Sequence, residues 1–247
     1  MNDFLKNEIS QDLFLGGQLS IFQPLTGYRA ATDPVLLAAA CPAKSSDEVL
    51  ELGCGVGTAS FCIFRRIRVS LTGLEIQENY ANLAIENGLL NKIPIHVEIG
   101  DLRKMPKNIK NKNFDQVVIN PPYYKTGTPS KNQGRNQSLR ITNPLSEWVN
   151  EGVKRLKPNG WITIINTPEN LIEILIALSK GTGDIQIKPL TSSRDKTANR
   201  VIIRAKKGSK GITKLYAPLI THVSEGNIKK FSYETEEILR RGSPLIF

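Results

Sequence analysis

Apolar residues along this chain gather into short runs, and glycine-rich turns or polar stretches separate one run from the next. Runs of leucine and β-branched residues predict four strands, at 49–52, 69–74, 95–99 and 114–119. Helical patterns from the first glycine turn to about Arg66 and from about Gln77 to Leu89 fill the gaps between the first three strands. Strands and helices that alternate in this way predict a mainly parallel, doubly wound sheet with right-handed crossovers.

The second half of the chain continues the pattern after a long polar stretch, 125–143, which contains no hydrophobic run. A loop of that length is usually functional or disordered. Pro144 then opens a helix that a turn at 157–160 closes. A strand at 161–165, a helix at 171–178 and strands at 185–190 and 201–204 complete a seven-stranded sheet. The expected fold class is therefore α/β, a Rossmann-like sheet of seven strands.

Both ends of the chain carry smaller elements. Residues 12–24 alternate around Gly16-Gly17 as in a β-hairpin, and Thr32 is expected to cap a helix that Pro42 ends. The tail from Gly208 predicts a strand near Leu215 and a helix from about Tyr233 to Arg241. We therefore expect three segments: a hairpin and helix at 1–42, a catalytic domain at 43–207 and a C-terminal extension at 208–247.

A glycine-rich turn follows the first strand of the sheet. The three glycines Gly53, Gly55 and Gly57 allow the backbone to approach a ligand closely at a helix N-terminus, and Glu51 stands just before them. Glu75 ends the second strand 75 − 53 = 22 residues beyond the first glycine, where an acid can bind a ribose diol. Asp101 follows the third strand, from which its carboxylate can reach an adenine amino group.

The fourth strand ends at Asn120-Pro121-Pro122-Tyr123. Proline cannot donate to a sheet, so the strand stops there and the stiff Pro-Pro step directs the asparagine side chain outward. The Asn120 oxygen and the Pro121 carbonyl can accept two N–H bonds from a flat amine, while Tyr123 offers a face for stacking. An ordinary proline turn after a strand is the alternative for this motif taken alone.

A glycine turn of this kind would also suit the dinucleotide of a dehydrogenase, with Thr58 or Ser60 in place of a final glycine. That alternative gives no reason for the asparagine motif on the fourth strand. Four features in order, each at the end of its own strand, favour S-adenosyl-L-methionine as the cofactor.

The chain carries a formal net charge of +10, which favours a polyanionic partner. Residues 102–140 and 188–214 each contain nine Lys or Arg against one acid, a net charge of 9 − 1 = +8 each. RNA is the expected partner, although solvated surface lysines would give the same composition. The RNA-binding candidates are Lys125, Arg135, Arg140, Arg194, Arg200, Lys206 and Lys207.

Cysteine and histidine give no sign of a metal site. Three cysteines and two histidines are scattered without ligand spacing, which predicts buried, reduced thiols rather than bound metal. The N-terminal residues lack the apolar core of a signal peptide, and no later run is long enough to span a membrane. We therefore expect a cytoplasmic protein without an obligate protein partner.

The order of the glycine turn, Glu75, Asp101 and Asn120 to Tyr123 resembles that of class I methyltransferases acting on amino nitrogens. Further motifs of this chain resemble those of bacterial adenine-N6 methyltransferases, which modify valine tRNA next to the anticodon. These motifs are residues 14–17, 23–24, 27–30, Asp33, 200–203, 206–208 and 235–240. The resemblance implies that Asn120 and Pro121 hold the target amine, that Pro122 shapes the motif, and that Tyr123 stacks on a flipped base. It also implies Tyr28 and Arg29 as cofactor-binding residues. The chain departs from the family at 166–168, where Asn-Thr-Pro replaces a more basic segment.

Other substrates and one non-enzymatic role fit parts of the pattern. A protein glutamine N5-methyltransferase uses the same asparagine motif, but it carries a sizeable helical domain before the glycine turn. An rRNA guanine-N2 methyltransferase is a further alternative, and a DNA adenine methyltransferase would need a recognition domain for which this chain has little room. The intact asparagine motif disfavours a cofactor-binding RNA chaperone without catalysis. A labelled-methyl transfer assay would separate such a chaperone from a methyltransferase.

Overall fold

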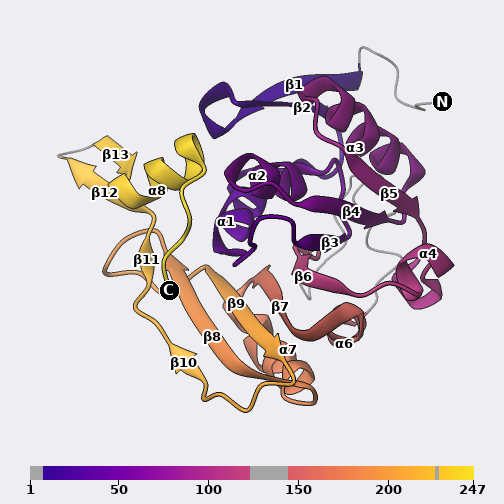
Figure 1. The fold of residues 1–247 in the computed structure, drawn as a ribbon. Helices are drawn as coiled ribbons and strands as arrows, with labels where there is room; N and C mark the ends of the chain where they lie inside the picture. Colours follow the sequence, from indigo (N-terminus) through magenta and orange to yellow (C-terminus); the bar gives the residue numbers. More distant parts are fainter. Residues whose placement is uncertain (1–7, 123–143, 226–227) are drawn as a thin grey trace.

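The computed structural model describes residues 8–122, 144–225 and 228–247 (Figure 1). Its large sheet contains seven long strands: β3 (Glu48–Leu52), β4 (Ser70–Glu75), β5 (Ile95–Ile99), β6 (Phe114–Ile119), β7 (Leu156–Asn166), β8 (Thr182–Thr191) and β9 (Arg200–Lys207). They follow the spatial order β5-β4-β3-β6-β7-β9-β8. Strand β9 runs antiparallel to both of its neighbours, whereas the pairs from β5 to β7 are parallel. The seven-stranded doubly wound sheet is confirmed.

Two very short strands extend the sheet beyond the seven. Strands β10 (Lys214–Leu215) and β11 (Leu219–Ile220) both pair in parallel with β8. The strand predicted near Leu215 is thus confirmed, and β11 was not expected. Strand β7 begins at Leu156 rather than at Trp161, because the turn residues join the strand across an irregularity in its pairing with β6.

Helices cover both faces of the sheet (Figure 1). One face carries α1 (Thr32–Ala40), α2 (Thr58–Arg66) and α3 (Glu78–Asn91); the other carries α4 (Lys107–Lys110), α6 (Leu145–Arg155) and α7 (Leu171–Leu178). Successive residues of β6 separate the two cores, because side chains alternate along a strand. Val118 packs with α1 and α2, whereas Val117 and Ile119 pack with α6 and α7.

The predicted N-terminal hairpin is present and lies against α3 (Figure 1). It consists of β1 (Ile9–Phe14), the short turn η2 (Leu15–Gly17) and β2 (Leu19–Pro24). Asn87 of α3 accepts a bond from the Phe22 amide (2.7 Å) and donates one to the Phe22 carbonyl (3.1 Å). Asn91 does the same for Ser20, at 2.9 and 2.7 Å. These carboxamides satisfy backbone groups that an edge strand would otherwise expose.

The start of α1 differs from the prediction. Thr32 is the first helical residue and Ala31 occupies the cap position without a side-chain hydrogen bond. The Asp33 carboxylate in the first turn instead provides the favourable charge at the helix N-terminus.

The C-terminal extension closes the core behind α1. It contains the hairpin β12 (His222–Glu225) and β13 (Ile228–Phe231), then α8 (Tyr233–Glu236) and one π-helical turn, η5 (Glu237–Arg241). Gly242 ends this helix in the left-handed conformation (φ 72°), directly after Arg241, where the predicted helix also ends. The sequence did not reveal the β12–β13 hairpin, in which the side chains with described burial (222–224, Lys230 and Phe231) are half-buried or exposed. Leu245 is buried, and its amide donates to the Ala39 carbonyl at 2.9 Å.

The three-segment division stays a prediction, although both terminal segments supply side chains to the same core as α1 and α2. Within the described part of the chain, no helix has the length and apolar character needed to cross a membrane.

Candidate active site

The glycine turn between β3 and α2 adopts a conformation that requires glycine. Gly53, Gly55 and Gly57 all have positive φ values, of 68°, 54° and 84°. A Cβ on Gly53 would lie 2.9 Å from the Trp148 ring, and one on Gly57 would lie 2.6 Å from the Phe61 ring. The turn therefore presents bare backbone at the carboxyl edge of the sheet and at the N-terminus of α2.

Glu75 lies beside this turn at the end of β4, with only 6% of its surface exposed. One carboxylate oxygen accepts a bond from the Gly55 amide and the other accepts one from the Gln77 amide, both at 2.9 Å. Burial raises the pKa of Glu75, and bonds from backbone amides partly oppose that rise. Each oxygen has lone pairs beyond the one that the backbone uses, so the carboxylate suits a ribose diol.

Glu51 has a different environment from Glu75, because it lies beneath the turn. Its Oε2 atom accepts bonds from the Ser60 amide (3.0 Å) and the Ser60 hydroxyl (2.5 Å) in the first turn of α2. Burial raises the pKa of Glu51 to about 7, despite the lowering effect of the Ser60 bonds, and the nearby charge of Glu75 adds to the rise. The carboxylate thus holds the glycine turn to α2, and direct cofactor contact by Glu51 stays a prediction.

Asp101 follows β5 at the same edge and begins the short helix η3 (Leu102–Lys104). Its carboxylate accepts a bond from the Arg103 amide at 2.8 Å and forms an ion pair with the Arg103 guanidinium at 3.0 Å. In the parallel sheet Glu75 pairs with Ile99, two residues before Asp101. The glycine turn, Glu75 and Asp101 therefore lie at three successive strand ends, an arrangement that fits an adenosyl cofactor.

Asn120 follows β6, next to the strand that leads into the glycine turn. Its Nδ2 atom donates a hydrogen bond to the Tyr28 hydroxyl at 3.1 Å. Pro121 is buried and Pro122 is exposed. The remaining candidates that follow this strand, Tyr123, Lys125, Arg135 and Arg140, lie outside the described residues.

Tyr28 belongs to the loop between β2 and α1 and lies between the glycine turn and Asn120. A Cβ on Gly55 would be 3.8 Å from Cε1 of its ring. Tyr80 of α3 holds its backbone: the Tyr28 amide donates to the Tyr80 hydroxyl (2.9 Å), which donates to the Tyr28 carbonyl (3.1 Å). The structure thus places Tyr28 at the predicted site, and it adds a contact with Asn120 that the sequence did not reveal.

Arg29 points away from this site into the N-terminal hairpin. Its guanidinium forms an ion pair with Asp12 at 2.5 Å and donates to the Ser10 hydroxyl and the Pro24 carbonyl. The predicted cofactor contact of Arg29 therefore has no geometrical support, since these bonds already use its donors on the hairpin side.

Trp148 and Glu147, in the first two turns of α6, are site residues that sequence analysis missed. The Trp148 ring covers Gly53, and the indole Nε1 and one Glu147 carboxylate oxygen are buried with no partner among the described residues. The signal available in the sequence was the position of this helix, which directly follows the polar stretch after the asparagine motif. The pattern of its apolar residues indicated packing only.

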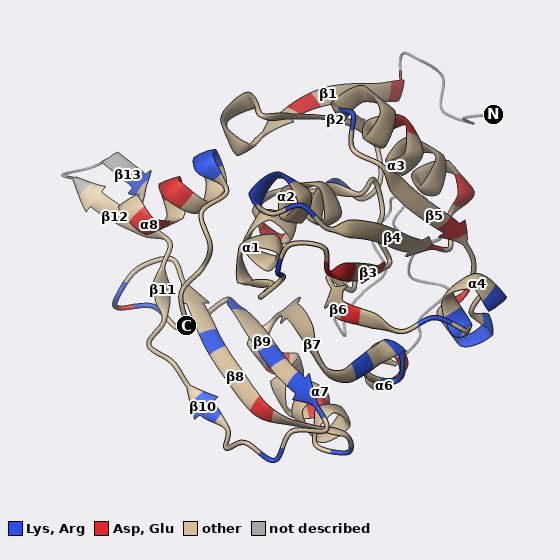
Figure 2. Cartoon of the chain, viewed as in Figure 1, with Lys and Arg blue, Asp and Glu red and all other residues tan. Residues whose placement is uncertain are grey.

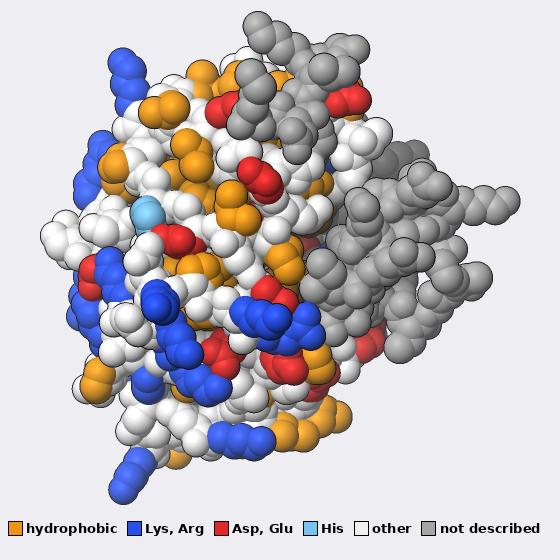
Figure 3. Space-filling model, turned by 90° about the vertical axis from the view of Figure 1, so that its right-hand side faces the viewer, with side chains coloured by type: hydrophobic (Ala, Val, Ile, Leu, Met, Phe, Trp, Pro, Cys, Tyr) orange, Lys and Arg blue, Asp and Glu red, His pale blue; other side chains and the backbone are white. Residues whose placement is uncertain are grey.

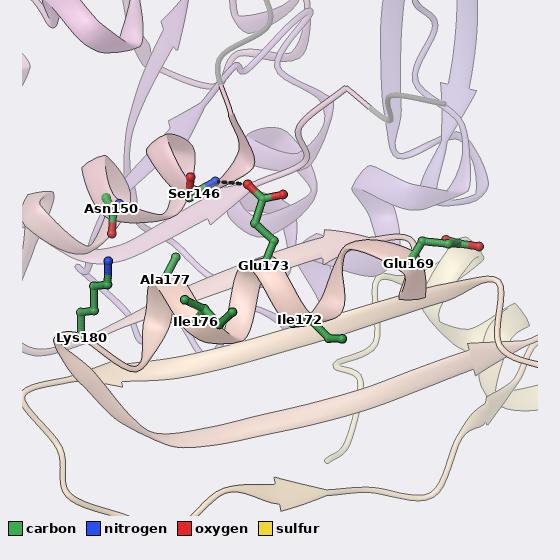
Figure 4. A pocket seen from close by; sticks show the side chains of 8 residues that line it. All are labelled: Ser146, Asn150, Glu169, Ile172, Glu173, Ile176, Ala177 and Lys180. Atoms are coloured by element: carbon green, nitrogen blue, oxygen red, sulfur yellow. Dashed lines mark hydrogen bonds between the residues drawn. The ribbon is translucent and has the colours of Figure 1, made fainter. Parts of the chain in front are cut away.

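A groove lies between α6 and α7 (Figure 4). The Ser146 amide at its rim donates to a Glu173 carboxylate oxygen at 2.8 Å, and Ile172 and Ile176 are exposed along it. Its lining includes none of the predicted site residues.

Four of the predicted RNA-binding cations lie within the described residues, and they divide between two edges of the sheet. Arg194 is exposed in the loop between β8 and β9, at the carboxyl edge. Arg200, at the start of β9, forms an ion pair with Asp33 at 2.8 Å. Lys206 pairs with Trp161, which is level with Val49 at the start of β3 through Gln116 of β6. Lys206 and Lys207 therefore lie at the opposite, amino edge.

Lys207 has a structural role at that amino edge. Its ammonium donates to the carbonyls of Lys154 and Leu156, at 3.3 and 2.7 Å, and partial burial lowers its pKa. Cations also mark α4 and α6 there (Figure 2). Figure 3 shows one face on which Lys and Arg side chains lie among acidic ones. Lys206 and Lys207 therefore do not lie at the edge that holds Asn120, because β9 runs antiparallel and its last residues reach the amino edge.

The fold is that of a class I methyltransferase, as known structures show. A predicted O-methyltransferase from Agrobacterium tumefaciens superposes with a TM-score of 0.71 at 20% identity, covering 86% of this chain and 98% of that one. A Thermus thermophilus 16S rRNA N2 G1207 methyltransferase in complex with AdoMet and guanosine gives a TM-score of 0.58 at 17% identity, covering 81% and 50%. The model of the methyltransferase small domain family matches residues 31–179, more than half of the chain.

Sequence relatives narrow this class. A Bacteroides fragilis protein named tRNA1(Val) (adenine(37)-N6)-methyltransferase is 30% identical over 162 residues, 64% of this chain and 68% of the relative. One of the same name from Proteus mirabilis is 27% identical over 192 residues, covering 75% and 76%. The chain belongs to this family of methyltransferases within the small domain group, and its cofactor is S-adenosyl-L-methionine.

Proposed function

We propose that this protein transfers a methyl group from S-adenosyl-L-methionine to the exocyclic N6 of an adenine in tRNA. The expected target is the adenine that its relatives' names number 37 in tRNA1(Val). The observation that carries the proposal is the position of Asn120, at the carboxyl end of β6, beside the strand that enters the glycine turn. A tRNA substrate also accords with the predicted cytoplasmic location.

The reaction mainly requires that the target amine be oriented, because the lone pair of an aromatic amine is delocalised into its ring. Hydrogen bonds from both N–H groups to the Asn120 oxygen and the Pro121 carbonyl favour a pyramidal nitrogen, whose lone pair can face the methyl group. The proton can leave after the transfer, so no general base is needed beforehand. The protein contributes through preorganised acceptors and a fixed geometry.

When bound, S-adenosyl-L-methionine supplies an electrophilic methyl group on a positively charged sulfur. The glycine turn and Glu75 would hold the cofactor at the ends of β3 and β4, with Asp101 beyond β5. Asn120 and Pro121 follow β6, the neighbour of β3, so the amine that they bind would lie next to the cofactor site. Stacking of the flipped base on Tyr123 would offset part of the cost of unstacking, since such a contact is worth about 1–3 kcal/mol.

Methylation of guanine N2 in rRNA requires the same kind of amine acceptor, and one structural neighbour is a 16S rRNA N2 G1207 methyltransferase. That likeness supports a shared fold, whereas the sequence relatives support adenine N6 in tRNA. These two candidate activities therefore differ in the RNA and the acceptor atom rather than in the cofactor.

The test is transfer of a labelled methyl group to an unmodified tRNA1(Val) transcript, followed by mass spectrometry of the nucleosides. We expect one N6-methyladenosine per transcript, and none when the target adenine is replaced by guanine. Asn120→Ala should lower the single-turnover rate while cofactor affinity stays unchanged. Methyl transfer to guanine N2 or to a protein glutamine, or a wild-type rate in Asn120→Ala, would overturn the proposal.

A further inference from the structure

We propose that Tyr28 is a positioning residue, whose hydroxyl holds the Asn120 carboxamide with the oxygen directed at the target amine. The inference rests on the proposed function. It names Tyr28 as the group that orients the Asn120 carboxamide so that its oxygen, the acceptor, meets the N–H groups of the target amine. The contact that carries it is the bond from Asn120 Nδ2 to the Tyr28 hydroxyl, at 3.1 Å, between residues 92 positions apart.

A carboxamide has an acceptor end and a donor end of nearly the same shape. Rotation by half a turn about its last bond would present the Asn120 NH2 group to an amine that is itself a donor. In the structure the Tyr28 hydroxyl accepts from Nδ2, and this bond holds the carboxamide with its oxygen on the side away from Tyr28. An amide oriented before the substrate arrives spares the cost of orienting it during the reaction.

The backbone of Tyr28 is held tightly enough for this role. The Tyr80 hydroxyl binds both the amide and the carbonyl of Tyr28. The approach is so close that a Cβ on the preceding Gly27 (φ 100°) would lie 2.8 Å from that hydroxyl oxygen. Tyr80 is itself buried in α3, so Tyr28 is fixed to the helix that follows Glu75.

The loop around Tyr28 is fixed on its other side as well. Buried Gln23 accepts from the Ala30 amide at 2.7 Å and donates to the Ala30 carbonyl at 3.3 Å, closing the loop at its base. Arg29 joins the loop to Asp12 of β1. The N-terminal hairpin therefore fixes the loop that places Tyr28 at the carboxyl edge of the sheet.

The Tyr28 hydroxyl stays neutral at this position. Desolvation of the hydroxyl and the charges of Glu51 and Asp33 raise the pKa of Tyr28, while the bond to Asn120 lowers it slightly. A neutral phenol can accept from Nδ2 without adding a negative charge near Glu51 and Asp33. Its ring edge lies beside Gly55, so the hydroxyl stands where the cofactor turn and the amine acceptors meet.

The experiment is a Tyr28→Phe variant, which keeps the ring and removes the hydroxyl, compared with Tyr233→Phe as a control. Tyr233 is 80% exposed in α8 and lies outside the site. In protein labelled with 15N at asparagine, Asn120→Ala identifies the Asn120 side-chain signals. We expect these signals to shift in Tyr28→Phe and to stay in place in Tyr233→Phe.

Kinetics then tests what the bond contributes. On an RNA that the wild type methylates, Tyr28→Phe should lower the single-turnover rate by about 10- to 100-fold. The KM values for RNA and cofactor, and the thermal midpoint, should stay near those of the control. Failure of the wild type to methylate any RNA would overturn the proposed function. A wild-type rate in Tyr28→Phe, or unshifted Asn120 signals, would overturn this inference alone.

Discussion

Glu51 is an ionisable group whose charge the fold disfavours. Only 3% of its surface is exposed, and Ser60 supplies its hydrogen bonds. Burial and the neighbouring Glu75 raise its pKa to about 7 in the folded protein, whereas the pKa of a glutamate in an unfolded chain is about 4.3. Between these two values the folded state binds more protons than the unfolded state.

The free energy of unfolding without cofactor should therefore fall as pH rises between about 4.3 and 7, and level off above that window. Glu51→Gln, which is neutral at every pH and keeps an acceptor for Ser60, should flatten this decline. Urea denaturation at several pH values between about 5 and 8 measures it. If the free energy of unfolding of Glu51→Gln fell as steeply with pH as that of the wild type, groups other than Glu51 would cause the decline.

Glu48 provides a control of opposite sign. Its contacts with Lys112 and Lys157, at 2.8 and 2.9 Å, lower its pKa. The stability that Glu48 contributes is present above the unfolded value and is lost as pH falls through the folded one. Glu48→Gln should therefore leave the decline between about 4.3 and 7 in place.

At the scale of elements, the N-terminal hairpin depends on two side chains of α3. Asn87 is fully buried and bonds to both backbone groups of Phe22 and to the Val56 carbonyl in the glycine turn. One carboxamide thus joins the hairpin, a helix and the cofactor turn. The sequence predicts the hairpin from its alternation and glycines, but not this docking, because asparagine is ordinarily an exposed residue.

Asn87→Ala should lower the free energy of unfolding by about 1–3 kcal/mol, since it leaves buried backbone groups without partners. The matched control is Asn82→Ala in the same helix, where no side-chain hydrogen bond is found within the described residues; its effect should stay within about 0.5 kcal/mol. Chemical denaturation of both variants measures the difference. Equal stability of the two variants would show that other contacts, not this carboxamide, hold the hairpin.

At the scale of the whole molecule, the sequence predicts what local patterns encode. Hydrophobic runs place the strands, and each chemical motif follows one, so Gly53, Glu75, Asp101 and Asn120 were expected at one edge and lie there. Contacts between distant segments carry no such local pattern. The bond from Asn120 to Tyr28 depends on how the hairpin docks, and the place of Lys206 depends on β9 running antiparallel.

The two basic segments consequently have different expected roles in RNA binding. The loop between β8 and β9 carries Arg194 and Lys196, both exposed at the edge that holds Asn120. Its shape is fixed, because the buried Thr191 hydroxyl contacts the carbonyls of Ser193 and Lys196 at 2.8 Å. Lys206 and Lys207 stand at the far edge, where Lys207 already binds two backbone carbonyls.

Replacing Arg194 and Lys196 together by glutamine should weaken tRNA binding and reduce its salt dependence. On single-stranded RNA each phosphate that a cation neutralises contributes about 0.7 to the slope of log affinity against log salt, so the double variant should lower that slope by about 1.4. The matched variant, Lys206→Gln with Lys207→Gln, removes the same charge at the amino edge and should leave the slope unchanged. Binding titrations between about 50 and 200 mM salt measure both, with thermal midpoints confirming that each variant is folded. An equal reduction of the slope in the two variants would mean that the RNA contacts both edges of the sheet, and the assignment of the binding surface to the carboxyl edge would be wrong.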